Sequence, residues 1–190
     1  KNINISNKNS ESNFTIFISG GSQGSEFVSN FATNLIKIID NEKIIKAKFI
    51  FQCSKNLIKK QQEKLRNIKS PIILKDFFIN IEEILANANL AICRAGAGTI
   101  VDLINFKLPS ILIPLPSSKD NHQFFNAKIL AKHDLAIIID QNNDDLDRAK
   151  RHIYETYSNA KKLESMNKKF DMIQVKNSNT LIYTLILNEN

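Results

Sequence analysis

The sequence predicts an α/β domain in which helices cover both faces of a parallel sheet. Short apolar runs with strand character alternate along the chain with patterns of helical spacing, and this alternation indicates parallel strands joined by helices. The longest apolar runs are strand-length and fall well short of the roughly 18 residues of a membrane span. With 190 residues, of which 43% are hydrophobic and 24% charged, the chain is typical of one globular domain with a substantial core.

The chain is expected to open with a linker or flexible arm at residues 1–13, which are rich in Asn, Ser and Lys and show no periodicity. The domain then spans residues 14–190. It begins with FTIFIS at residues 14–19, a β-prone run that stops at two glycines and therefore suits a buried parallel strand. After Gly24, apolar side chains recur at helical spacing as far as Asp40, which predicts the first helix.

The remaining elements continue this alternation to the end of the chain. Strands are predicted at residues 47–53, 71–74, 90–93, 110–113 and 135–139. Helices are predicted at residues 56–67, 81–86, after Gly98, at 121–132 and from Asp144 onward, with a last apolar helix at 181–187. Phe124 and Phe125 are expected to lie in the core. Together these elements predict a Rossmann-like sheet.

Two glycine-rich loops are the strongest indication of a ligand site. LAICRAGAGTIVD at residues 90–102 joins a predicted buried strand to a helix through small residues, and GGSQG at residues 20–24 has the same design. Small residues let a ligand approach the backbone, and free N–H groups at a helix start favour an anion such as a diphosphate. Asp102 is expected one turn into the helix, on the face of Thr99, within reach of a sugar hydroxyl. Two such loops predict a nucleotide site.

The loops that follow the strands of a parallel sheet meet at one rim, where such sheets bind their ligands. Four candidate loops, at residues 20–24, 77–78, 94–99 and 117–123, each follow a predicted strand. We therefore expect all four at the same rim.

Other nucleotide-binding and hydrolase motifs fit poorly. The first loop, SGGSQG, is not the GxGxxG of a dinucleotide site, and the second strand ends in Gln52, Cys53 and Ser54 with no acidic residue for a ribose. The chain has no GxxxxGK[ST] phosphate loop, and no GxSxG elbow with a plausible His/Asp pair.

Charge and cysteine content limit the possible classes of partner and cofactor. The net charge of +7 is spread along the chain without an aromatic-plus-basic pattern, so we expect no nucleic-acid partner, whereas an anionic substrate is compatible. Cys53 and Cys93 each end a strand-like run and are expected to be buried thiols. No CxxC or Cys/His spacing indicates a metal, and no cofactor is expected. His122 is expected to be a polar residue of the rim rather than a base.

Three stretches carry a family resemblance: FISGGSQGS, DFFINIEEILANANLAICRAGAGTIVDL and LPSILIPLPSSKDNHQFFNAKIL. They closely resemble the carboxy-terminal half of the MurG family, bacterial glycosyltransferases that transfer N-acetylglucosamine from its UDP derivative to lipid I, making lipid II of peptidoglycan. The resemblance covers about residues 14–140. It implies the GT-B arrangement of two Rossmann-like domains, in which the carboxy-terminal domain holds the UDP-sugar and no metal is obligatory.

The resemblance also assigns roles to particular residues. Asp102 stands where the family usually has a glutamate on the ribose. The expected UDP-N-acetylglucosamine site comprises Gly21, Ser22, Gln23 and Gly24 at the diphosphate and sugar, Phe78 at the uracil, Ala97, Gly98 and Thr99 at the phosphates, Asp102 at the ribose, and His122 and Gln123 at the sugar hydroxyls. For Arg94, two roles remain open: contact with the diphosphate, or a surface salt bridge at the sheet edge.

The family's amino-terminal domain has no counterpart in residues 1–13, and the first residue is Lys rather than Met, so we expect part of a longer protein. The resemblance places the catalytic base, the lipid I site and the membrane contact in that domain. It implies a cytoplasmic protein, peripheral on the inner face of the bacterial plasma membrane, whose donor half binds UDP-N-acetylglucosamine but does not transfer the sugar alone.

The alternative functions are a non-catalytic donor-binding subunit of a two-chain glycosyltransferase and a UDP-sugar epimerase domain. A nucleic-acid-binding module is the weakest alternative.

Overall fold

The computed structural model describes residues 14–21, 24–43, 45–143 and 145–177. Within them lies one six-stranded sheet in the order β3-β2-β1-β4-β5-β6, and every neighbouring pair is parallel. The strands are β1 (Phe14–Ser19), β2 (Ala47–Gln52), β3 (Ile72–Lys75), β4 (Leu90–Cys93), β5 (Ser110–Leu112) and β6 (Ala136–Ile138). The predicted α/β class and parallel sheet are confirmed.

Helices alternate with the strands as predicted, and the last two helices follow the last strand. They are α1 (Glu26–Glu42), α2 (Ile58–Leu65), α3 (Ile81–Asn87), α4 (Ala97–Asn105), α5 (His122–Ala131), α6 (Leu146–Ser158) and α7 (Ala160–Asn177), with a 3-10 turn at Lys119–Asn121. The fourth helix begins at Ala97 rather than after Gly98, because Gly96 is extended (φ −64°, ψ 154°) and forms its N-cap. The arm predicted at residues 1–13 and the helix predicted at 181–187 lie outside the described residues.

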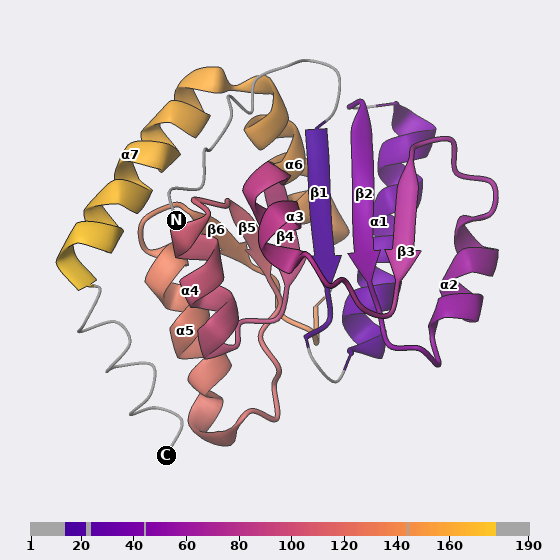
Figure 1. The fold of residues 1–190 in the computed structure, drawn as a ribbon, viewed down its shortest axis with the longest axis horizontal. Coiled ribbons are helices and arrows are strands. Elements are labelled where there is room, and N and C mark those ends of the chain that lie inside the picture. Colours follow the sequence, from indigo (N-terminus) through magenta and orange to yellow (C-terminus); the bar gives the residue numbers. More distant parts are fainter. Residues whose placement is uncertain (1–13, 22–23, 44, 144, 178–190) are drawn as a thin grey trace.

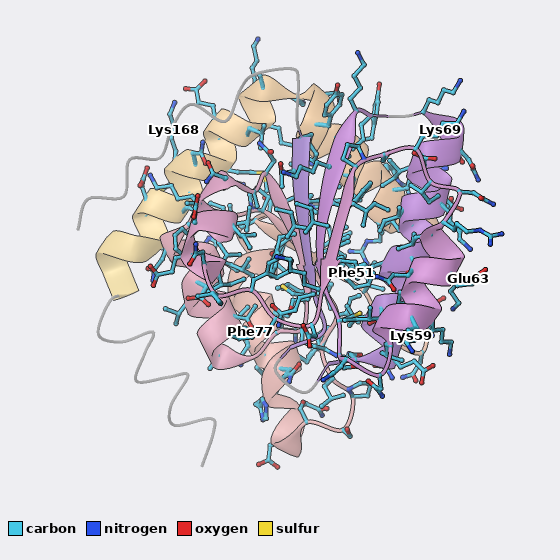
Figure 2. The ribbon with its side chains drawn as sticks, turned by 45° about the vertical axis from the view of Figure 1, so that its right-hand side comes forward. Phe51, Lys59, Glu63, Lys69, Phe77 and Lys168 are labelled. Carbon is cyan, nitrogen blue, oxygen red and sulfur yellow. The ribbon has the colours of Figure 1, made fainter. Side chains whose placement is uncertain are left out.

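The sheet separates two layers of helices. Ile16 and Ile18 of β1 belong to a core cluster that includes residues of α1 and α6, whereas Phe17 points to the opposite face and joins a cluster with residues of α3, α4, α5 and α7. Figure 1 shows the strands fanned between α2 at one end of the molecule and α7 at the other. In Figure 2, Phe51 lies in the interior, whereas Lys59, Glu63, Lys69 and Lys168 lie at the periphery. Both faces of the sheet are therefore buried, as its near-continuous apolar strands require.

The strand register aligns the carboxyl ends of all six strands in one row. The aligned terminal residues are, in sheet order, Lys75, Gln52, Ser19, Cys93, Leu112 and Ile138. The chain winds outward in one direction from β1 through β2 to β3 and in the other from β4 through β5 to β6. The boundary between the paired strands β1 and β4 is thus the topological switch point. Open α/β sheets usually bind their ligands beside the carboxyl ends of the strands at this point. The predicted common rim is confirmed by this register.

Helix α5 corrects one expectation about the core. Phe124 and Phe125 are 40% and 54% exposed rather than buried. The helix packs inward through Asn126, Ala127 and Leu130, which leaves both rings on the solvent side. The ammonium group of Lys128 lies 4.6 Å from the ring centroid of Phe124 and 5.7 Å from that of Phe125. The expectation was wrong because apolar character alone does not show which face of a helix packs.

Among the described residues, no helix is both long and apolar enough to cross a membrane.

A buried histidine makes the stability of the fold depend on pH. His152 of α6 is 7% exposed, and its Nε2 atom is buried with no hydrogen-bond partner among the described residues. Burial, reinforced by the positive charge of Lys162, lowers the pKa of His152 from 6.5 to about 4. The unfolded chain therefore takes up this proton near pH 6.5, but the folded chain takes it up only near pH 4.

We predict that the free energy of unfolding falls as the pH is lowered from 7 to 5, by about 1–2 kcal/mol from this residue. Urea denaturation of the wild-type chain and of His152→Leu, each at both pH values, measures the effect. The substitution should remove most of the loss, whereas His122→Gln, at a partly exposed site, should not. An unchanged pH dependence in His152→Leu would assign the loss to other groups.

Candidate functional site

A cavity of about 270 Å³ opens at the carboxyl rim of the sheet, at the switch point between β1 and β4. Its floor is formed by the ends of these strands, and its walls by the loop between β3 and α3 and by the first turns of α4. The lining residues are Phe17, Ser19, Gly21, Gln52, Phe77, Phe78, Ile79, Ile81, Leu85, Ala91, Cys93, Arg94, Thr99, Asp102 and Leu103.

The structure brings together part of the predicted site. Five of the predicted residues line the cavity: Gly21, Phe78, Arg94, Thr99 and Asp102. Five others do not line it: Gly24, Ala97, Gly98, His122 and Gln123. Ser22 and Gln23 lie outside the described residues. The cavity therefore unites the two glycine-rich loops with the loop after β3, while the start of α5 lies outside its lining.

The first glycine loop adopts a conformation that favours glycine. Gly21 and Gly24 have φ values of +85° and +70°, which L side chains rarely adopt. The Gly24 N–H donates to the Gly21 carbonyl over 3.0 Å and closes the turn. A Cβ atom on Gly24 would lie 2.5 Å from the Cβ of Ser54. Gly24 is thus packed closely against Ser54 in the loop after β2.

The second glycine loop leaves the amino terminus of α4 without a side-chain cap. Gly96 occupies the N-cap position, and no side chain there accepts a hydrogen bond from the helix. The N–H groups of Ala97, Gly98 and Thr99 therefore belong to the first turn, where an α-helix provides no internal acceptors. Such N–H groups, together with the positive end of the helix dipole, attract anions.

Asp102 places a carboxylate on the same side of α4 as Thr99, as the spacing of three residues predicts. Both residues line the cavity. Partial burial raises the pKa of Asp102, and the nearby carboxylate of Glu82 raises it further. When ionised, this carboxylate accepts hydrogen bonds and suits a pair of sugar hydroxyls.

The loop between β3 and α3 supplies the apolar wall. Phe78 is 9% exposed, and the ammonium group of Lys75 lies 5.6 Å from its ring centroid. Phe77 and Ile79 also line the cavity, although they are 67% and 88% exposed. The candidate loop predicted at residues 77–78 included Phe77, but sequence reasoning missed Ile79. The only signal for Ile79 was its place beside Phe78 in a loop that follows a strand.

Arg94 is buried, which excludes the surface salt bridge considered from the sequence. It is 8% exposed, and its Nη1 donates to the carbonyls of Ile113 and Pro114 over 3.0 and 3.1 Å. Its Nη2 donates to Ser25 Oγ over 2.6 Å and to Gln141 Oε1 over 2.8 Å. The role of Arg94 at a diphosphate stays a prediction.

Helix α5 reaches the same rim through a different set of contacts. Gln123 Oε1 accepts a hydrogen bond from the Leu115 N–H over 3.0 Å, which fixes the loop after β5. Asn126 is 1% exposed, and its Nδ2 donates to the Ala95 carbonyl over 3.1 Å. Its Oδ1 is buried without a partner among the described residues. Sequence reasoning missed Asn126. The sequence signal that could have found it is a polar residue four positions before Leu130, which places it on the buried face of the helix.

The cysteines do not provide a reactive thiol. Both are free and buried. Burial, with a smaller contribution from the Asp102 carboxylate, raises the pKa of Cys93 to about 12. Burial also raises the pKa of Cys53, with the Asp76 carboxylate acting in the same direction. In the part of the chain that the structure describes, no group of three His, Cys, Asp or Glu residues could hold a metal ion.

The sheet order, the two helix layers and the rim cavity define a Rossmann-like α/β domain, the fold of each half of a GT-B glycosyltransferase. The model of the glycosyltransferase family 28 C-terminal domain matches residues 15–182, and the chain belongs to this family.

Similar proteins agree with this membership. The chain is 35% identical over 175 residues to a Campylobacter jejuni protein named UDP-N-acetylglucosamine–N-acetylmuramyl-(pentapeptide) pyrophosphoryl-undecaprenol N-acetylglucosamine transferase, covering 92% of this chain and 49% of that one. A Wolbachia protein of the same name is 31% identical over 182 residues, covering 96% and 53%. The crystal structure of Acinetobacter baumannii MurG has the same fold, with a TM-score of 0.76 at 21% identity, covering 96% and 51%. The chain thus spans about half the length of these relatives.

Two glycines of the candidate site should respond in opposite ways to an added methyl group. Gly24→Ala should lower the free energy of unfolding by about 1–3 kcal/mol, because it adds strain at positive φ and a clash with Ser54. Gly98 lies in α4, and a Cβ atom there would meet no neighbouring group within 4 Å, so Gly98→Ala should be neutral or stabilise by up to about 1 kcal/mol. Urea denaturation of both variants measures the difference. Equal effects would contradict the loop geometry.

Proposed function

We propose that this chain is the donor-binding half of an N-acetylglucosaminyltransferase of peptidoglycan synthesis and that its rim cavity holds UDP-N-acetylglucosamine. One observation carries the proposal: a single cavity combines an apolar wall, the Asp102 carboxylate and Thr99 of the first turn of α4, a helix whose amino terminus has no side-chain cap. These three surfaces suit a uracil, a ribose and a diphosphate respectively. The names of the Campylobacter and Wolbachia relatives support the choice of sugar and acceptor.

The proposed roles follow the order of groups in the ligand. The uracil lies against the wall formed by Phe78, and Asp102 accepts hydrogen bonds from the ribose hydroxyls. The diphosphate lies between the loop at Gly21 and the first turn of α4, where Thr99 lines the cavity. The sugar then points along the rim toward the start of α5, where His122 and Gln123 provide polar groups. Asp102 is one methylene shorter than a glutamate, so its ribose contact is longer or passes through a water.

The proposed reaction is an inverting displacement at the anomeric carbon. The acceptor hydroxyl attacks this carbon while a general base takes its proton, and the bond to the UDP oxygen breaks. In this proposal the base and the acceptor site belong to the amino-terminal half of the enzyme. This chain contributes the orientation of the donor and the stabilisation of departing UDP by the N–H groups at the start of α4.

Partners and location follow from the same proposal. The relatives' names specify a pyrophosphoryl-undecaprenol acceptor, a lipid-linked molecule that must be met at a membrane surface. We propose that the complete enzyme acts as a peripheral protein on the cytoplasmic face of the bacterial plasma membrane. The amino-terminal acceptor domain, in the same protein or in a separate chain, is then the partner that faces lipid I.

Calorimetric titration with UDP-N-acetylglucosamine tests the donor site, with UDP-glucose, GDP-mannose and NAD as comparators. We expect selective binding of UDP-N-acetylglucosamine and at least about a tenfold loss of affinity in Asp102→Ala, which removes the hydrogen bonds to the ribose. Asp147→Ala is the matched control, because that carboxylate is 86% exposed on α6 and does not line the cavity. Absence of binding to any UDP-sugar, or an equal loss in both variants, would refute the proposal.

A further inference from the structure

The guanidinium group of Arg94 joins the loops at one half of the rim. Arg94 follows β4, and its four acceptors lie in the loops that follow β1, β5 and β6. Ser25 has a second role, because its Oγ also accepts a hydrogen bond from the Val28 N–H and caps α1. One buried side chain therefore connects four loops that are far apart in the sequence.

All four acceptors of Arg94 are neutral oxygens. They are two backbone carbonyls, a hydroxyl and a side-chain amide. None of the ion pairs among the described residues involves Arg94. Burial alone lowers the pKa of Arg94 below its usual value, with no contribution from a charged neighbour. Burying a cation without a counter-charge is costly, so the position calls for an explanation.

The uncompensated charge lies beside the part of the cavity that both glycine loops form. Arg94 lines this cavity together with Gly21 and Thr99. A Cβ atom on Gly21 would lie 3.9 Å from the Cγ of Arg94, so the backbone of the first loop runs directly over this side chain. The four hydrogen bonds hold the guanidinium group below the loops, and the charge acts from there through a low-dielectric medium.

We propose that Arg94 is a fixed and uncompensated positive charge that favours the diphosphate of the ligand without touching it. This inference rests on the proposed donor site. The neutral acceptors fix the position of the guanidinium group but do not cancel its charge, so its field remains available to an anion in the cavity. Arg94 is then a positioning residue for four loops and an electrostatic residue for the ligand, and the nucleoside part of the ligand does not depend on it.

Gln141→Glu tests this assignment with one isosteric change. The variant keeps the hydrogen bond to Arg94 Nη2 but gives the guanidinium group a carboxylate partner. We expect the affinity for UDP to fall by about five- to tenfold, while the affinity for uridine changes less than about twofold. We also expect a higher Tm, because the buried charge becomes paired. Calorimetry with UDP and uridine and thermal denaturation measure these effects. Arg94→Met is less informative, because it can also unfold the loops.

Asn142→Asp is the matched control. It adds the same negative charge one position further along the same loop, at an exposed residue whose side chain does not contact Arg94 in the structure. UDP affinity should change less than about twofold in this variant. Equal losses in the two variants, or an unchanged ratio of UDP to uridine affinity in Gln141→Glu, would overturn the role of Arg94. A wild-type chain that binds neither UDP nor uridine would instead refute the proposed donor site itself.

Discussion

The buried hydrogen bonds of Arg94 are the constraint on which the rim depends. A parallel sheet fixes where its strands end, but it leaves the loops beyond them free to choose among conformations. One guanidinium group, bonded to oxygens of three other loops, removes much of this freedom. The first turn of α1 is capped by the same Ser25 hydroxyl that Arg94 contacts, so helix start and loop geometry are set together. The loops after β1 and β4, which contribute Gly21 and Arg94 to the cavity lining, are consequently tied together before any ligand arrives.

Register and glycine conformation complete this arrangement. The register places the ends of β1 and β4 side by side, and the winding direction changes between them. The loop after β1 leads to α1 on one face of the sheet and the loop after β4 leads to α4 on the other, so a cavity can form between them. The positive φ values of Gly21 and Gly24 then turn the first loop back toward α1. Each feature alone is common in α/β proteins, but their coincidence at the switch point produces a site suited to a nucleoside diphosphate.

Most of the fold could be predicted from the sequence, because strand and helix patterns alternate and each glycine loop lies at a junction. The position of Thr99 and Asp102 on one side of the cavity also followed, since helical spacing fixes it. Contacts between distant segments could not be predicted. Phe124 and Phe125 are exposed because the face of α5 that packs is decided by its neighbours, and the buried state of Arg94 depends on oxygens up to 69 positions away. Gln123 was predicted for the ligand, but its Oε1 holds the Leu115 backbone.

The candidate site divides the recognition of its proposed ligand between side chains and backbone. Under the proposed function, the uracil and ribose are recognised by Phe78 and Asp102, whereas the diphosphate is recognised by N–H groups that any residue other than proline can provide. Binding of the anion therefore depends on the geometry of the loops rather than on the identity of their side chains. That geometry rests on glycines and on buried groups behind the loops, such as Arg94 and Asn126.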